Sequence, residues 1–256
     1  SDNFLTYAGD FNGDGWPDLI VANAGPNYNS YFLNNGDGTF SPVTGDPVVN
    51  DHESFDVITA GDLDGDGDLD VIAAPGMLPA YSYDLYLYLN NGDGSFLRLP
   101  GVPHAGINAG GGCSFTDIDN DGDLDIMVDA YDGSNIVLLN DGAGNLTQLT
   151  TGVLVNSGNY NKQPGWTDYD RDGDLDLFLA VNNYFGGNNK FFQNNGNDNS
   201  WLEIACQGTI SNTGGIGSRI SVTATIGGLP VTQVQEVTPR HSLITHFGLG
   251  DAFQVD

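Results

Sequence analysis

The chain has 256 residues, enough for one large β domain or two smaller ones. It carries 6 Lys and Arg against 34 Asp and Glu, a formal net charge of −28, so we expect no nucleic-acid partner, because little in the chain could neutralise phosphates. It has no run of about 18 apolar residues and no basic-then-apolar leader, so we expect no transmembrane segment and any signal peptide to be removed or to lie outside this sequence.

The acidic residues are almost all aspartate, since only Glu53, Glu203 and Glu236 are glutamates. The short Asp side chain suits turns and oxygen cages, so this bias indicates local geometry rather than solubility alone. The 37 glycines and many Asn-Gly and Asp-Gly pairs indicate tight turns between alternating apolar residues. The composition predicts an all-β fold, and 39% hydrophobic residues argue against disorder.

One unit recurs four times in chain order within residues 1–199, at a period of 51 to 55 residues. Each copy has a strand, an aspartate loop, a very apolar strand and a strand–turn–strand hairpin. The loops with their apolar strands occupy residues 9–23, 61–74, 116–130 and 167–181, and the hairpins occupy 30–43, 87–99, 137–149 and, less regularly, 190–204. Four strands at this period predict a propeller-like array of four four-stranded repeats.

The loops share the pattern D-x-[DN]-x-D-G-x-x-D. Oxygen ligands at positions 1, 3, 5 and 9, with a backbone carbonyl at position 7, could wrap one Ca²⁺. The sequence therefore predicts four Ca²⁺ ions, and at position 7 we expect only the carbonyl to coordinate. The predicted ligands are Asp10, Asn12, Asp14, Trp16 and Asp18; Asp62, Asp64, Asp66, Asp68 and Asp70; Asp117, Asp119, Asp121, Asp123 and Asp125; and Asp168, Asp170, Asp172, Asp174 and Asp176.

Other readings of these loops fit less well. Mg²⁺ prefers a small octahedral shell with retained waters, and zinc prefers His or Cys ligands, which the loops lack. An EF-hand also begins D-x-D-x-D-G but needs a Glu at position 12, where this chain has Val21, Ala73, Val128 and Leu179. Aspartates that only shape turns are the remaining alternative.

These loops and hairpins resemble the FG-GAP/VCBS repeats of integrin α-subunit propellers and of many secreted bacterial proteins. The resemblance implies calcium binding in each loop and an extracellular or cell-surface location. Propellers of that family usually have seven blades, whereas this chain shows four motifs. Either the propeller is small or part of the ring lies outside this chain.

Residues 200–256 resemble the ASPIC/UnbV module, which often follows such repeats in secreted proteins. The marks are Trp201-Leu202, Ser211-Asn212, residues 215–219 and residues 247–250. Within this stretch Ile220, Val222, Ala224 and Ile226 alternate with polar residues, which predicts a strand with one buried face. The resemblance implies a small C-terminal β module and an extracellular location. It implies no catalytic chemistry for this module.

The sequence offers no catalytic constellation. The four histidines, His52, His104, His241 and His246, are scattered, and no nucleophile or metalloprotease motif is present. Aspartate pairs could hydrolyse glycosides, but these aspartates are assigned to calcium. We therefore expect no enzyme. Whether Cys113 and Cys206 form a disulfide or stay separate thiols is left open.

We expect a secreted, calcium-stabilised adhesion or assembly protein. A lectin-like polysaccharide-binding propeller and an accessory domain of a polysaccharide-degrading enzyme are the alternatives. Glycans or other surface proteins are the expected partners, and the candidate ligand-binding residues are Tyr81, Tyr83, Tyr160 and Tyr184, which lie in loops rich in amides.

The two ends of the chain suggest self-association. The first loop begins soon after Ser1, and Asp256 falls where the tail module would continue, so both ends look like sheets with an unpaired edge. Strand addition at such edges predicts head-to-tail assembly into an oligomer or an extracellular fibre. The alternative is a closed propeller that pairs its own first and last strands.

Overall fold

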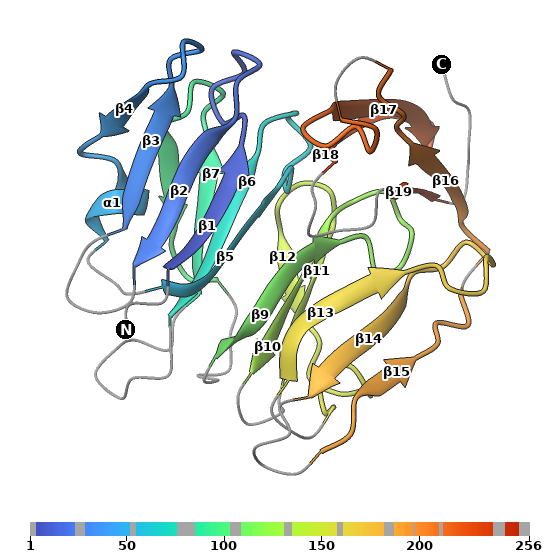
Figure 1. The fold of residues 1–256 in the computed structure, drawn as a ribbon. Helices are drawn as coiled ribbons and strands as arrows, with labels where there is room; N and C mark the ends of the chain where they lie inside the picture. Colours follow the sequence, from blue (N-terminus) through green and yellow to red (C-terminus); the bar gives the residue numbers. More distant parts are fainter. Residues whose placement is uncertain are drawn as a thin grey trace.

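The computed structural model of the chain describes residues 4–23, 29–51, 55–75, 85–102, 109–130, 135–157, 161–181, 187–196, 198–209, 212–237 and 244–250. Over these residues the chain is almost entirely antiparallel β structure with one short helix, so the predicted all-β class is confirmed (Figure 1). No helix of the described part is long and apolar enough to cross a membrane.

Three four-stranded antiparallel sheets follow one another along the chain, each with its strands in sequence order (Figure 1). The predicted strand, loop, apolar strand and hairpin are all present in each sheet. The strands are β1 (Phe4–Gly9), β2 (Asp18–Asn23), β3 (Ser30–Asn34) and β4 (Phe40–Val43); β5 (Phe55–Gly61), β6 (Asp70–Pro75), β7 (Tyr86–Asn90) and β8 (Phe96–Leu99); and β9 (Ala109–Thr116), β10 (Asp125–Ala130), β11 (Ile136–Asn140) and β12 (Leu146–Gln148).

The next sheet departs from the expected pattern. It contains β13 (Asn161–Thr167), β14 (Asp176–Val181) and β15 (Lys190–Phe192), so the described residues give it three strands instead of the expected four. The predicted fourth hairpin is wrong in its second half, because β16 (Ser200–Ala205) pairs with β19 (Ile244–Gly250) and not with β15. The longer β19 satisfies the backbone groups of β16 over six residue pairs.

The remaining strands lie over one end of the array. The strand β17 (Arg219–Ile226) pairs with β18 (Leu229–Glu236), and this hairpin packs on β19 around Val222, Ala224, Phe247 and Leu249 (Figure 1). The alternation predicted for residues 220–226 matches a strand in which Val222 and Ala224 are buried. The Gly250 amide donates to the Asn120 carbonyl at 2.9 Å, so these strands contact the aspartate loop after β9.

Apolar side chains fill the space between successive sheets. The strands β6 and β10, each the second strand of its sheet, are apolar on both faces, as predicted. One face of each strand packs on the preceding sheet and the other on the following sheet. Three apolar clusters span the boundaries. They include Ile20, Ala22, Val71 and Ala73; Ile72, Ala74, Ile126 and Val128; and Met127, Leu177 and Leu179.

The array is open across the described residues. The strand β1 contacts β5, β5 contacts β9 and β9 contacts β13, so the sheets follow one another in chain order. The described residues form no closed propeller. The first sheet has all four of its strands, with β1 and β4 at its edges.

Two smaller features complete the fold. Asp46 caps the helix α1 (Pro47–Asn50) through the Val48 amide, and its second carboxylate oxygen accepts from the Phe96 amide of β8 at 2.9 Å. The helix is therefore tied to the second sheet. Cys113 and Cys206 are both free thiols, which settles the open disulfide question.

Candidate metal centres

Each aspartate loop joins the first and second strands of its sheet. The loop curls around the aspartate at position 1: Asp10 Oδ1 accepts from the Asp14 amide at 3.1 Å and Asp10 Oδ2 from the Gly15 amide at 2.9 Å. In the third loop Asp117 accepts in the same way from the amides of Asp121 and Gly122. The curl needs a left-handed residue after position 5, and the glycine there has a φ of 86°, 95°, 104° and 96° in the four loops in turn.

Three of the loops bring acidic side chains together closely enough to hold one cation. In each, one carboxylate oxygen from each of three aspartates lies within 4.8 Å of the others. Oxygen-only donor sets of this kind are those that Ca²⁺ prefers. The groups are Asp62, Asp64 and Asp66; Asp117, Asp119 and Asp125; and Asp168, Asp170 and Asp176.

The second loop contains the clearest orphaned acceptors. Asp62 is 5% exposed, and neither of its carboxylate oxygens accepts a well-formed hydrogen bond from the described residues, although the nearby Gly67 and Gly65 amides act to lower its pKa. A buried carboxylate without a partner is costly, and a bound cation would satisfy it. The Asp62 side chain therefore fits a metal ligand on grounds separate from the loop pattern.

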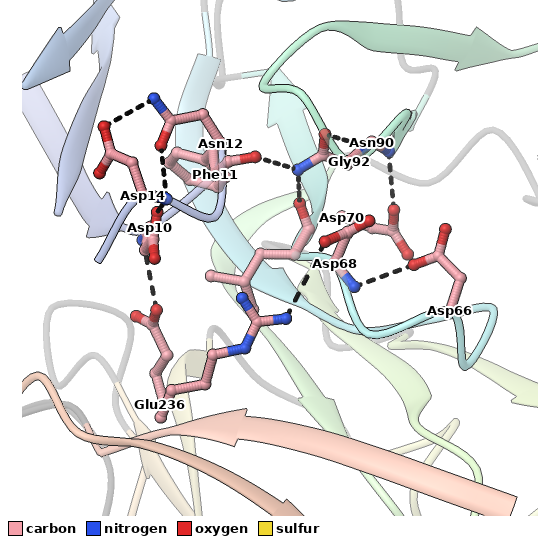
Figure 2. A network of polar contacts seen from close by, with 12 residues as sticks. Asp10, Phe11, Asn12, Asp14, Asp66, Asp68, Asp70, Asn90, Gly92 and Glu236 are labelled. Atoms are coloured by element: carbon pink, nitrogen blue, oxygen red, sulfur yellow. Dashed lines mark hydrogen bonds and ion pairs between the residues drawn. The ribbon is translucent and has the colours of Figure 1, made fainter. Parts of the chain in front are cut away.

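The first loop differs at position 3. Asn12 replaces the aspartate, and its Nδ2 donates to Asp14 Oδ2 at 3.0 Å (Figure 2). Glu236 of β18 approaches the same loop, where its Oε1 accepts from the Asp10 amide at 3.2 Å (Figure 2). This loop carries less negative charge at the ligand positions than the other three.

The aspartate at position 9 also accepts hydrogen bonds from two backbone amides, a role that the sequence pattern did not predict. Asp70 Oδ2 accepts from the Leu63 amide at 2.8 Å. Its Oδ1 accepts from the Asn90 amide at the end of β7 at 2.9 Å (Figure 2). The same pair of bonds is made in every loop, so this side chain ties loop and hairpin together. The other three residues are Asp18, Asp125 and Asp176.

Side chains at position 7 turn toward the following hairpin. A β-carbon added at Gly36 would lie 2.8 Å from Trp16 Nε1, and one at Gly92 would lie 2.7 Å from an Asp68 carboxylate oxygen. Asp123 and Asp174 meet Gly142 and Gly196 in the same way. These side chains are directed at glycines, which is compatible with coordination by the backbone carbonyl alone.

Burial makes the loops electrostatically costly without a cation. It raises the pKa of Asp62 to about 7, with Asp66 and Asp64 adding to the effect. Burial also raises the pKa of Asp70 and of Asp125 to about 8, against the lowering effect of the amides that each accepts from. A divalent cation would remove this cost by stabilising the ionised forms.

A cavity of about 410 Å³ lies where the C-terminal strands cover the ends of β1, β5, β9 and β13. Its wall combines aromatic and charged side chains, including Phe115, Trp166, Arg171, Glu203 and His246. The His246 ring stacks on Trp201 and its Nε2 forms a 2.8 Å hydrogen bond with Asn120 Oδ1. Burial lowers the pKa of His246 to about 4, so its imidazole is neutral at pH 7.

The tyrosines predicted to bind a ligand cannot be placed in the structure. Tyr81, Tyr83, Tyr160 and Tyr184 lie outside the described residues, as do His52, His104 and His241. The proposed ligand site in the tyrosine-rich loops stays a prediction.

The match to a known protein family lies in the first half of the chain. Residues 10–73 and 76–128 match a family model described as FG-GAP-like repeat, so this part of the chain contains FG-GAP-like repeats, as the sequence predicted. No curated protein matches the chain. A solved chain from the Tc holotoxin pore of Photorhabdus luminescens is similar, with 18% identity and a TM-score of 0.43. The match covers 70% of this chain and 8% of that one.

Proposed function

We propose that this chain is a calcium-stabilised, non-enzymatic β scaffold that acts in adhesion or assembly outside the cell. The observation that carries the proposal is the set of three-aspartate groups in loops at the same end of successive sheets. The proposal includes four Ca²⁺ ions, one per loop, with residues 168–199 as an irregular fourth repeat and residues 200–256 as an ASPIC/UnbV-like module.

Calcium is the cation that the donor set favours. Each group offers carboxylate oxygens only, and a carbonyl at position 7 would add a further oxygen ligand. Four ions would take the formal net charge from −28 to −20. Extracellular calcium modules bind at roughly 10⁻⁴–10⁻³ M, so millimolar calcium outside the cell would fill such sites.

A structural role for calcium agrees with how the carboxylates are held. Asp70 and its equivalents accept hydrogen bonds from two backbone amides each, so the loops are parts of the sheets rather than open reaction sites. The β strands that follow the loops are buried on both faces in the second and third sheets. A cation in each loop would therefore stabilise the array as a whole.

Thermal unfolding in excess Ca²⁺ and in excess EGTA tests the proposal. At a hundredfold excess over the dissociation constant, each site adds about 2.7 kcal/mol if the unfolded chain does not bind calcium. We expect chelation to lower the melting temperature by roughly tens of degrees, and calorimetric titration to give four sites, the first loop being the weakest. The same melt in EGTA and in calcium would contradict the proposal, and Mg²⁺ is the matched control ion.

A polysaccharide-binding function is the second candidate, favoured by the 410 Å³ cavity beside Trp166 and Glu203. Aromatic faces with nearby hydrogen-bonding groups suit sugar rings, and the volume lies in the usual range for ligand pockets. A glycan array in millimolar Ca²⁺ tests it. Sugar-competable binding that Glu203→Gln weakens and Asp37→Asn leaves unchanged would support this candidate, and an array without such binding would count against it.

A further inference from the structure

The boundaries between successive sheets are built from equivalent side chains. The earlier sheet contributes one residue from loop position 2, one from the middle of its second strand and one from its third strand. In the first two sheets these three side chains are each at most 1% exposed. In the third sheet the two strand residues are fully buried. The sets are Phe11, Ile20 and Tyr31; Leu63, Ile72 and Leu87; and Ile118, Met127 and Val137.

The equivalent set in the sheet β13–β15 is exposed. Tyr169 is 60% exposed, Phe178 43% and Phe191 46%, and the rings of Tyr169 and Phe191 pack edge to face at 4.8 Å. Phe178 and Phe191 are register partners on neighbouring strands, so the three rings lie on one face. We call Tyr169, Phe178 and Phe191 the aromatic end face.

The opposite end of the array has the complementary surface. In the second, third and fourth sheets, the other face of the second strand packs against the preceding sheet, as Val71, Ile126 and Leu177 do. The corresponding residues of the first sheet are Leu19 and Val21, which stay partly exposed beside Phe32 and the 42% exposed Phe40. We call Leu19, Val21, Phe32 and Phe40 the leading face.

One hydrogen bond crosses each internal boundary, and the two end faces carry the donor and the acceptor that would continue the series. Asn90 Nδ2 of the second sheet donates to the Phe11 carbonyl of the first at 2.8 Å (Figure 2). Asn140 and Asn194 donate across the next two boundaries to the carbonyls of Leu63 and Ile118. Continuing the series would pair Asn34 of a leading face with the Tyr169 carbonyl of an aromatic end face. Asn34 already donates to the Pro17 carbonyl at 3.0 Å, as Asn90 does to the equivalent Leu69 carbonyl.

We propose that the aromatic end face of one copy packs on the leading face of a second copy, repeating the contact made at the internal boundaries. The assembly part of the proposed function is thereby assigned to sheet faces instead of the strand edges considered from the sequence. The contact joins different surfaces, so it is heterologous and can extend into a filament. It needs the folded sheets but no particular ligand in the cavity.

Two variants, each blocking one face, test the proposal by sedimentation velocity in millimolar Ca²⁺. Phe178→Lys places a charge on the aromatic end face, and Val21→Lys places one on the leading face. We expect the unsubstituted chain to form concentration-dependent oligomers and each variant alone to associate at least tenfold more weakly. An equimolar mixture of the variants should form a 1:1 dimer that does not grow, because the dimer uses the one intact face of each partner and both remaining faces carry a blocking lysine.

The control is Leu97→Lys, which changes a 57% exposed residue of β8 outside both faces and should assemble like the unsubstituted chain. Calcium-dependent melts of all the chains show that they are folded. A folded, calcium-binding chain that remains monomeric at high concentration would overturn the stacking while leaving the calcium scaffold intact. Oligomers that survive both substitutions in one chain, or that form in either variant alone as readily as in the unsubstituted chain, would also overturn it.

Discussion

In the second loop, the three-aspartate group is formed by positions 1, 3 and 5, whereas the aspartate at position 9 holds backbone amides of the loop and of the following hairpin. Asp70 is fully buried, and both of its oxygens accept from backbone amides, one in its own loop and one at the end of β7. Asp64 belongs to the three-aspartate group and is partly exposed. The two residues are alike in the sequence pattern, but Asp70 accepts hydrogen bonds from two backbone amides and Asp64 faces the other carboxylates of the three-aspartate group.

Removing each of these side chains should separate the two roles. Asp70→Ala leaves two buried amides without acceptors, so we expect it to lower the free energy of unfolding by about 3 kcal/mol in calcium and also in EGTA. Asp64→Ala should destabilise only when calcium is present. Urea unfolding of both variants in the two buffers measures this, and equal behaviour of the two would contradict it.

Asp129 is a buried acid that lies within the strand β10 and outside the predicted calcium ligands. It occupies the place of Ala22, Ala74 and Ala180 in the other sheets and is fully buried, and neither carboxylate oxygen has a hydrogen-bond partner among the described residues. Burial raises its pKa to about 7. The folded chain therefore keeps this proton up to pH 7, whereas the unfolded chain loses it above about pH 4.

This difference gives a pH-dependent prediction. Between about pH 4 and pH 7 the unfolded state releases the Asp129 proton and the folded state does not, so the free energy of unfolding falls as the pH rises. Asp129→Ala should remove that dependence and stabilise the chain at pH 8 by about 4 kcal/mol, with little effect at pH 4. Denaturant melts across this range measure it. Equal effects at both ends of the range would count against the assignment, and Ala22→Asp is the reciprocal test.

At the scale of single elements, each hairpin is joined to its surroundings through the last residue of its first strand. Asn140 Nδ2 donates to the Leu63 carbonyl of the preceding sheet and to the Leu124 carbonyl of its own loop. The amide of Asn140 in turn donates to Asp125. One side chain thus fixes the position of β11 against two loops.

Asn140→Ala should leave two buried carbonyls without donors and lower the free energy of unfolding by about 2 kcal/mol. Asn34→Ala is the matched control, because Asn34 Nδ2 has one carbonyl acceptor, Pro17, within the described residues of its own chain. We expect a smaller loss for Asn34→Ala at protein concentrations where the chain is monomeric. Calorimetric unfolding measures both, and a loss for Asn34→Ala as large as that for Asn140→Ala would contradict the expectation.

At the scale of the whole molecule, the C-terminal strands lie across the aspartate loops and depend on their shape. The Gly250 amide donates to the Asn120 carbonyl, Arg219 lies 3.9 Å from Asp68, and Glu236 accepts from the Asp10 amide. Three separate loops therefore contact β17–β19. A change in the shape of the loops would therefore reach these strands directly.

Hydrogen exchange should detect this coupling. We expect amides of β19, including Gly250, to exchange at least tenfold faster in EGTA than in calcium, because the loop carbonyl that holds Gly250 is displaced when the carboxylates repel. Amides at the centre of β6, which is buried between two sheets, provide the internal reference. Unchanged exchange in β19 on chelation would show that the C-terminal strands are independent of the loops.

The sequence by itself determined the local structure of this protein. Alternating aspartates, the glycine after position 5 and the apolar strands after each loop predict loop, strand and hairpin, because each depends on backbone geometry over a few neighbouring residues. The period of the motif predicts successive small sheets for the same reason. These are the parts in which the sequence and the structure agree.

Only the tertiary structure decided which groups at long sequence separation meet. It pairs β16 with β19 rather than β15, places β17–β19 over the loops, and gives the position-9 aspartates their partners in the hairpins. It also shows that equivalent side chains are buried at the internal boundaries but exposed at Phe178. Whether an apolar residue is covered depends on what lies on the other side of its sheet, and no local pattern in the chain carries that information.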